Sequence, residues 1–145
     1  MIGELLRKYV ALGALAVGAA SMAGCGMYTN QSRCEYNGDL DGERIITRIV
    51  ENFGLEHDSF YMTVFQNDGT TITYIDDFRQ DLRLDTVEVV NGSDKKLYEA
   101  GNSAHKPIMT AAQAKFEEYC NRIAELKRTE NEQNLQKSLD KIKNK

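Results

Sequence analysis

Hydrophobic and polar residues alternate along residues 33–100, and turn-forming residues interrupt the alternation repeatedly. The clearest case is the pair of alternating runs 60–65 and 70–75, which flank Asn67-Asp68-Gly69. Asp-Gly tolerates the positive φ values of a tight turn, so this stretch predicts a β-hairpin. A second hairpin is predicted around Asn91-Gly92-Ser93-Asp94, with Asp85 to Val90 before it and Lys95 to Glu99 after it.

Two further strands are predicted on the N-terminal side of these hairpins. Residues 35–40 form a first strand that ends at Asp39-Leu40-Asp41-Gly42, where acidic residues and glycine favour a turn. Residues 43–53 are rich in β-branched residues, although their apolar positions also fit a helical period. Branched side chains lose rotamer freedom in helices, so a strand is favoured. The apolar phase changes between residues 81–84 and Val87, which predicts a bend or bulge near Asp85 and Thr86.

A helix is predicted from about residue 107 to 127. Apolar residues recur there at intervals of three and four, which makes one stripe: Ile108, Ala112, Phe116, Tyr119, Cys120, Ile123 and Leu126. The helix starts either with Pro107 in its first turn or with Thr110 as the N-cap, Gln113 then completing a capping box. After residue 127 the apolar residues thin out, so residues 128–145 are expected to form a charged helical or disordered tail.

These elements together predict an α+β fold. We expect an antiparallel β-meander of about five or six strands, with one C-terminal amphipathic helix packed on it. Residues 33–127 would make a single small domain, because a chain of this length supports one hydrophobic core and not two.

The N-terminal 24 residues have the layout of a secretory signal peptide. Arg7 and Lys8 precede an apolar and glycine run, residues 10–20, and small residues follow. A transmembrane helix needs about 20 apolar residues, and this run is shorter.

The signal ends at Met22-Ala23-Gly24-Cys25, which resembles the lipobox of bacterial-type lipoprotein signal peptides. The pattern departs from that family in Met22, where leucine is commonest. The resemblance implies that the thiol of Cys25 is acylated and that the chain is cut before it, leaving residues 25–32 as a tether. In similar lipoproteins of two-membrane bacteria, a residue other than aspartate after the cysteine implies the outer membrane, and here Gly26 follows. The alternatives are ordinary cleavage that leaves Cys25 as a plain thiol, and an uncleaved anchor.

Beyond the signal, the chain is similar in style to small lipoproteins of many prokaryotic genomes, in which a hairpin-rich region precedes one C-terminal helix. That resemblance implies no particular activity. We expect an exported protein that is anchored to the outer membrane or the outer cell surface.

Lipidation of Cys25 would leave two cysteines, Cys34 and Cys120. An exported compartment is oxidising, and the number of cysteines that remain is even. A disulfide between them is therefore predicted. It would close a loop of 86 residues, for which the chain-entropy model gives roughly 4 to 5 kcal/mol of stabilisation. The alternative is that Cys120 is a small buried hydrophobic residue and Cys34 a free thiol.

Charge is distributed unevenly along the chain. Residues 35–120 hold 17 acidic and 8 basic side chains, net −9, whereas residues 121–145 hold 4 and 7, net +3. An acidic body argues against nucleic acid as a partner. The basic tail suits a phosphate-rich membrane surface or an acidic partner, although a solvated segment is the simpler interpretation.

Residues suited to catalysis or metal binding are few. His57 and His105 both fall in loop-like stretches without metal-ligand spacing, and no phosphate-binding loop or nucleophile motif is present. Asp39, Asp41 and Glu43 alternate as calcium ligands often do. An EF-hand loop places its glycine at position six, and Gly42 comes at position four, so solvated turn acids are favoured over a calcium site.

The sequence therefore favours a non-enzymatic, membrane-anchored lipoprotein that acts as a binding or scaffolding module. The alternatives are a calcium-binding lipoprotein and a small envelope enzyme. Its partners would be the membrane, through the lipid at Cys25, and an envelope protein; no cofactor is predicted. The candidate contact residues are Tyr61, Phe65 and Tyr74, because exposed aromatics and unpaired sheet edges favour partner capture. The competing interpretation places these aromatics in the core or in cross-strand pairs.

Overall fold

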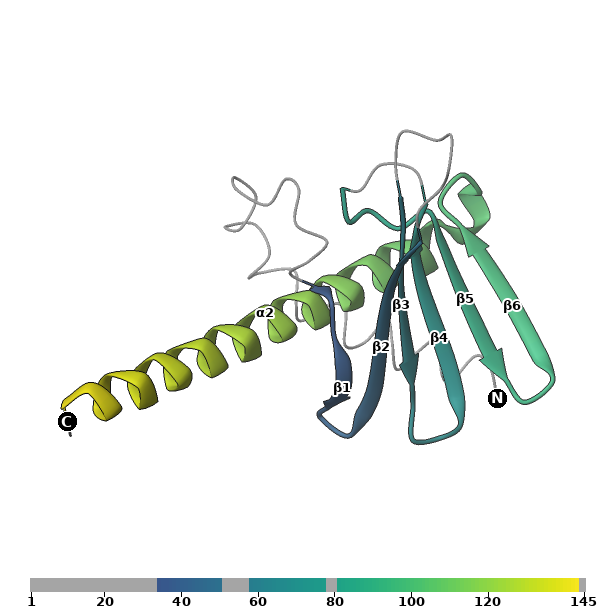
Figure 1. Ribbon diagram of the computed structural model, residues 1–145. Helices are drawn as coiled ribbons and strands as arrows, with labels where there is room; N and C mark the ends of the chain where they lie inside the picture. Colours follow the sequence, from purple (N-terminus) through teal and green to yellow (C-terminus); the bar gives the residue numbers. More distant parts are fainter. Residues whose placement is uncertain (1–33, 51–57, 78–80, 144–145) are drawn as a thin grey trace.

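The predicted α+β fold is confirmed by a computed structural model, which describes residues 34–50, 58–77 and 81–143. Six antiparallel strands form one sheet in the order β1-β2-β3-β4-β5-β6, and one long helix crosses a face of it (Figure 1). The strands are β1 (Asn37–Leu40), β2 (Glu43–Val50), β3 (Ser59–Phe65), β4 (Thr70–Asp76), β5 (Thr86–Asn91) and β6 (Asp94–Glu99). A short 3₁₀ helix, η3 (Ser103–His105), leads into α2 (Lys106–Lys143).

Three tight turns set the register of the meander. Asp41 and Gly42 join β1 to β2 with φ values of 54° and 86°, the two positive values that a type I′ turn requires. Gly92 opens the two-residue loop between β5 and β6 at φ 59°. Between β3 and β4, Gly69 has φ 84°, and the Asp68 side chain accepts a hydrogen bond from the Thr70 amide at 2.8 Å. The hairpins predicted from these turn residues are therefore confirmed.

Residues 43–50 form a strand and not the alternative helix. The rest of that predicted strand, residues 51–53, lies outside the described residues. The β1–β2 pairing continues to Tyr36, whose carbonyl accepts a hydrogen bond from the Thr47 amide at 2.9 Å. The Tyr36 ring lies over Gly38, where a Cβ would stand 2.8 Å from the tyrosine oxygen. The glycine thus makes room for an aromatic side chain that packs against the core.

The core lies between one face of the sheet and α2. Strand alternation buries seven large side chains on that face: Ile45, Phe60, Met62, Val64, Ile72, Tyr74 and Val87. The helix contributes Met109, Phe116, Tyr119, Cys120 and Ile123. At the centre, the Phe116 ring contacts Phe60 and Tyr74, with ring centroids 6.0 and 5.8 Å away. The predicted helix stripe is confirmed from Phe116 to Ile123. At its start Met109 is buried, and Ile108 only partly.

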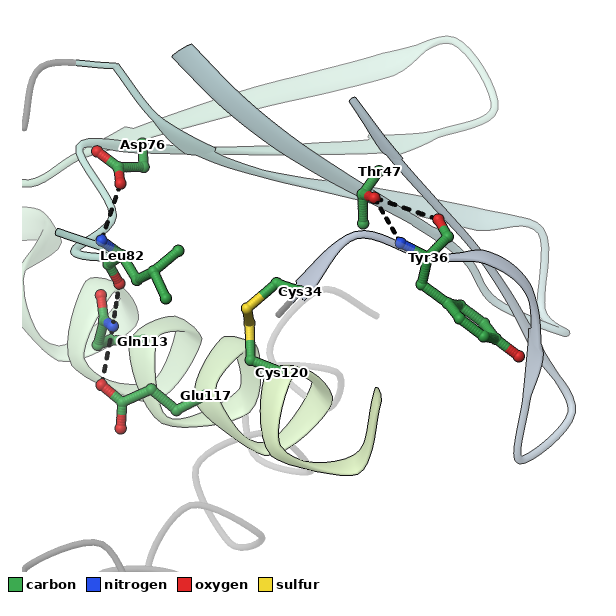
Figure 2. Close-up of a disulfide and its surroundings, with 8 residues drawn as sticks. All are labelled: Cys34, Tyr36, Thr47, Asp76, Leu82, Gln113, Glu117 and Cys120. Atoms are coloured by element: carbon green, nitrogen blue, oxygen red, sulfur yellow. Dashed lines mark hydrogen bonds between the residues drawn. A yellow bond between two sulfur atoms is a disulfide. The ribbon is translucent and has the colours of Figure 1, made fainter. Parts of the chain in front are cut away.

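The predicted capping box at Thr110 is wrong. The helix begins four residues earlier, at Lys106, so the Thr110 hydroxyl donates a hydrogen bond to the Lys106 carbonyl inside the helix. Gln113 has a different role. Its side-chain amide donates to the Leu82 carbonyl at 2.9 Å (Figure 2). Its side-chain oxygen accepts from the Leu84 amide at 2.8 Å. Pro107 does lie in the first turn, as the other prediction had it.

The segment before β5 bends, as the change of apolar phase predicted. A bend occurs at Asp85, and Leu82 has φ 59°. The Leu82 amide donates to the buried carboxylate of Asp76 at 2.9 Å (Figure 2). Asp76 and Gln113 thus hold this segment from opposite sides, which places Leu84 in the core.

The helix extends well beyond the packed domain. It continues without a break to Lys143 and, at about 1.5 Å per residue, is roughly 57 Å long. Its last part projects past the β1 edge of the sheet (Figure 1). Every residue from Arg128 to Lys143 is exposed. The tail, for which helix and disorder were both expected, is therefore helical as far as Lys143.

Candidate functional site

The predicted disulfide between Cys34 and Cys120 is confirmed (Figure 2). The two Cα atoms lie 4.7 Å apart, within the usual range for a disulfide, and the cysteines are 86 residues apart in the sequence. Both side chains are buried. The bond joins the segment just before β1 to the middle of α2, so it secures the N-terminal end of the folded body to the helix.

The predicted lipidation site and tether precede this disulfide. Cys25, the signal peptide and the tether all lie outside the described residues. Within the described part of the chain, no helix has the length and hydrophobicity needed to cross a bilayer.

The face of the sheet opposite α2 is the most exposed apolar surface of the meander, and no described element packs on it. We call it the open face. The strand register places four exposed large apolar side chains on it: Ile46 (36% exposed), Val50 (38%), Phe65 (41%) and Leu97 (47%). Tyr61, Ile75 and Val90 share this face and are partly buried.

The candidate contact residues Tyr61 and Phe65 both belong to the open face. Phe65 pairs across the strands with Arg44 and Thr71. Tyr61 is more constrained, because the Arg48 guanidinium lies 4.6 Å from its ring centroid and its hydroxyl contacts the Asp77 carboxylate at 3.5 Å. Phe65 is therefore the more accessible of the two aromatic side chains.

Tyr74, the third candidate contact residue, is on the other side of the sheet. It pairs with Met62, so its side chain points to the core, where it is buried against Phe116 and Tyr119. The prediction that Tyr74 takes part in a contact surface is wrong, and the competing core interpretation holds. Ile46, Val50 and Leu97, which were not predicted as contact residues, lie on the open face instead.

Both edges of the sheet carry features that oppose strand pairing with another chain. β6 contains Lys95 and Lys96, and the Lys95 ammonium lies 2.7 Å from the Glu88 carboxylate on β5. β1 has only four residues. Short edge strands and edge lysines are common protections against edge-to-edge association. The open face is thus a better candidate for binding than either edge.

The three carboxylates considered for calcium have separate partners. Asp39 approaches Arg44 at 3.7 Å, and Asp41 forms an ion pair with Arg122 of the helix. Glu43 accepts hydrogen bonds from Tyr119 and Gln66. No cluster of three potential metal ligands occurs among the described residues. The structure therefore engages Asp39, Asp41 and Glu43 separately and does not gather them into one ligand set.

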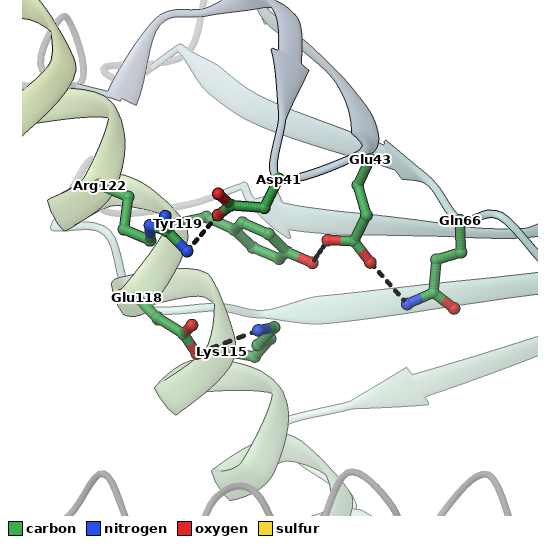
Figure 3. A network of polar contacts seen from close by, with 7 residues as sticks. All are labelled: Asp41, Glu43, Gln66, Lys115, Glu118, Tyr119 and Arg122. Carbon is green, nitrogen blue, oxygen red and sulfur yellow. Dashed lines mark hydrogen bonds and ion pairs between the residues drawn. The ribbon is translucent and has the colours of Figure 1, made fainter.

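These partners instead attach the first hairpin to the helix (Figure 3). From the sheet side, Asp41 and Glu43 reach Arg122 and Tyr119, which lie nearly one turn apart on α2. Glu43 lies on the helix-facing side of β2, where alternation would otherwise place an apolar residue. The Tyr119 hydroxyl supplies the hydrogen bond that such a half-buried carboxylate needs. In the sequence, only the place of Glu43 at an inward-facing position of the strand could have indicated that it contacts the helix.

The one histidine in the described segments, His105, makes contacts that stabilise the fold. The His105 ring accepts a hydrogen bond from the Glu99 amide at 3.1 Å and packs edge-on against Tyr98 at 5.4 Å between centroids. It therefore holds the turn between β6 and α2. His57 lies outside the described residues.

Comparisons with protein-family models, with curated proteins and with solved structures found no match to this chain.

Proposed function

We propose that this protein is an exported lipoprotein, anchored by lipid at Cys25, which presents the open face of its sheet to a protein of the cell envelope. The lipobox-like residues before Cys25 support the anchor. The buried Cys34–Cys120 disulfide supports export, because such bonds form and persist in oxidising compartments.

The exposure of Ile46, Phe65 and Leu97 is the observation that carries the binding role. An antiparallel sheet that faces water on one side usually carries polar residues there. Here large apolar side chains lie on three strands, β2, β3 and β6, of that side. Apolar and aromatic residues bordered by charged ones are typical of protein contact surfaces. Arg44, Glu88 and Lys95 supply such charges on the same face.

A non-catalytic role fits the arrangement of the described polar groups. His105 holds a turn, and Asp41 and Glu43 bind the helix. Catalysis requires an acid, a base or a nucleophile to converge on one place. His105 holds the turn between β6 and α2, apart from Asp41 and Glu43 at the hairpin between β1 and β2.

The anchor is tested by cell fractionation. The wild-type chain should sediment with membranes and be released by detergent, whereas Cys25→Ser should leave the membrane fraction or accumulate as the uncut precursor. The control is Cys34→Ser/Cys120→Ser, which removes two cysteines and leaves the lipidation residue. A Cys25→Ser variant that stays with membranes at the processed size would refute anchoring through this residue.

The binding face is tested by site-specific photocrosslinking in intact cells. A photoreactive amino acid at Phe65 should give a discrete crosslinked product, and the same group at Ser103, which is exposed on η3, should not. A Leu97→Glu change on the open face should remove the product. Equal crosslinking from both positions, or a product that persists with Leu97→Glu, would rule out the open face as the contact.

A further inference from the structure

A second exposed apolar surface lies on the projecting end of the helix. Leu135, Leu139 and Ile142 are 63%, 42% and 72% exposed. Their spacing of four and three residues places them on one side of α2, and we call them the outer stripe. At about 100° per residue, the outer stripe is rotated by roughly 100° from the core-facing side centred on Phe116. It is therefore no continuation of the core stripe and points in a different direction.

The charges around the outer stripe are mostly basic. Between residues 127 and 143, Lys127, Arg128 and Lys143 lie within about 90° of its centre. Glu132 is the acidic residue on this side, and it is close to Arg128, at 3.9 Å. Glu130 and Asp140 lie more than about 130° away. An apolar stripe bordered by basic residues matches the boundary between acyl chains and anionic headgroups.

The expected anchor places a membrane within reach of this surface. Cys25 precedes Cys34 by nine residues, which span at most about 30 Å. Cys34 is bonded to Cys120, and Ile142 lies 22 residues further along the same helix, roughly 33 Å away. The segment from Cys25 to Cys34 and the helix from Cys120 to Ile142 have similar lengths. The outer stripe can therefore touch the membrane that holds Cys25.

We propose that the end of α2, from Arg128 to Lys143, lies on an anionic lipid surface beside the anchor, with the outer stripe facing the lipid. This inference rests on the proposed lipid anchor. Three apolar side chains give only reversible binding by themselves, and a tether to the same membrane raises their effective concentration. A coiled coil with a second copy is less favoured, because the outer stripe covers about one heptad and stable coiled coils need about three to four.

The chain contains no tryptophan, so a single introduced tryptophan reports on one position. Leu139→Trp places the reporter on the outer stripe, and Gln133→Trp places a matched control on the opposite side of the helix. The mature chain, residues 25–145, is coupled through Cys25 to a maleimide lipid in vesicles made of equal parts phosphatidylglycerol and phosphatidylcholine. The disulfide protects the other two cysteines from this coupling.

With Leu139→Trp, the emission should shift to shorter wavelength and acrylamide quenching should fall roughly threefold, as expected for a side chain at the headgroup boundary. The Gln133→Trp control should keep the spectrum of an exposed residue. Adding Leu135→Glu and Ile142→Glu to Leu139→Trp should abolish the shift. Unshifted emission from Leu139→Trp, or equal shifts from both reporters, would overturn the proposal. A shift that grows with protein concentration in the absence of vesicles would assign the surface to a second copy and would also overturn it.

The experiment separates this inference from the proposed function. The maleimide lipid supplies the anchor chemically, so the tryptophan readout does not depend on whether a cell acylates Cys25. Conversely, fractionation of Cys25→Ser reports on the anchor, whether or not the outer stripe binds lipid.

Discussion

The two halves of α2 share one continuous helical backbone but differ in the burial and the contacts of their side chains. The inner half, residues 106–127, buries five side chains and carries the disulfide. The outer half, residues 128–143, buries none. Its helix is supported locally, by pairs such as Arg128–Glu132 and Gln136–Asp140 and by the absence of glycine and proline. Buried and exposed side chains are thus separated along one helix, and substitutions in the two halves should have different effects on stability.

The largest effect is expected from Phe116→Ala in the inner half. Phe116 is completely buried between Phe60 and Tyr74, so its truncation leaves a cavity at the centre of the core. The free energy of unfolding should fall by about 3 to 5 kcal/mol. Urea denaturation followed by circular dichroism measures the loss. A decrease below about 1 kcal/mol would contradict the assigned core position.

Loss of the disulfide should have the next largest effect. Cys34→Ser/Cys120→Ser removes a covalent link that closes an 86-residue loop. We expect a loss of about 2 to 4 kcal/mol, below the chain-entropy value because reduced, unfolded chains keep some structure. Reductant should lower the stability of the wild-type protein by the same amount and leave the double variant unchanged. A wild-type protein insensitive to reductant would contradict a bond between these residues.

A smaller effect is expected from Tyr119→Phe, which keeps the ring and removes the hydroxyl. The Glu43 carboxylate then loses a hydrogen bond from the helix and keeps the one from Gln66. Stability should fall by about 1 to 2 kcal/mol, as for other hydrogen bonds to a charged group. The matched control is Tyr98→Phe, for which no comparable change is expected. Equal losses for the two variants would show that the Glu43 contact contributes little.

Truncation of the outer half should have the smallest effect on stability. A chain that ends at Lys127 loses no buried side chain, so its free energy of unfolding should stay within about 0.5 kcal/mol of the full chain. Helical circular dichroism should still decrease, because sixteen residues of helix are removed. A clear loss of stability would show that the outer half packs on the body and would break the contrast between the two halves.

Most of the fold could be predicted from the sequence because its strands are short, alternating and separated by specific turn residues. Asp41-Gly42 and Gly92 meet the positive φ values of their turns, which is a local requirement. The extent of the helix could not be predicted in the same way. Beyond Lys127 no packing distinguishes helix from disorder, and many small local preferences decide the outcome.

The candidate contact residues were predicted less well, because the face on which each side chain lies depends on the pairing register of the strands. Residues 60–65 are largely apolar on both sides of the strand, so alternation by itself does not identify the core face. Tyr74 could be assigned only by pairing it with Met62 across the hairpin, which puts it on the face opposite Tyr61. Gln113 was missed because its partners, Leu82 and Leu84, lie about thirty residues away in the sequence.

The central claim is that Cys25 carries a lipid and begins the mature chain. Mass spectrometry of the N-terminal peptide from membrane-purified protein tests it most directly. The account predicts a peptide that starts at Cys25 and carries the mass of a diacylglyceryl thioether. An N-terminal peptide that starts elsewhere, or one with an unmodified Cys25 thiol, would contradict it.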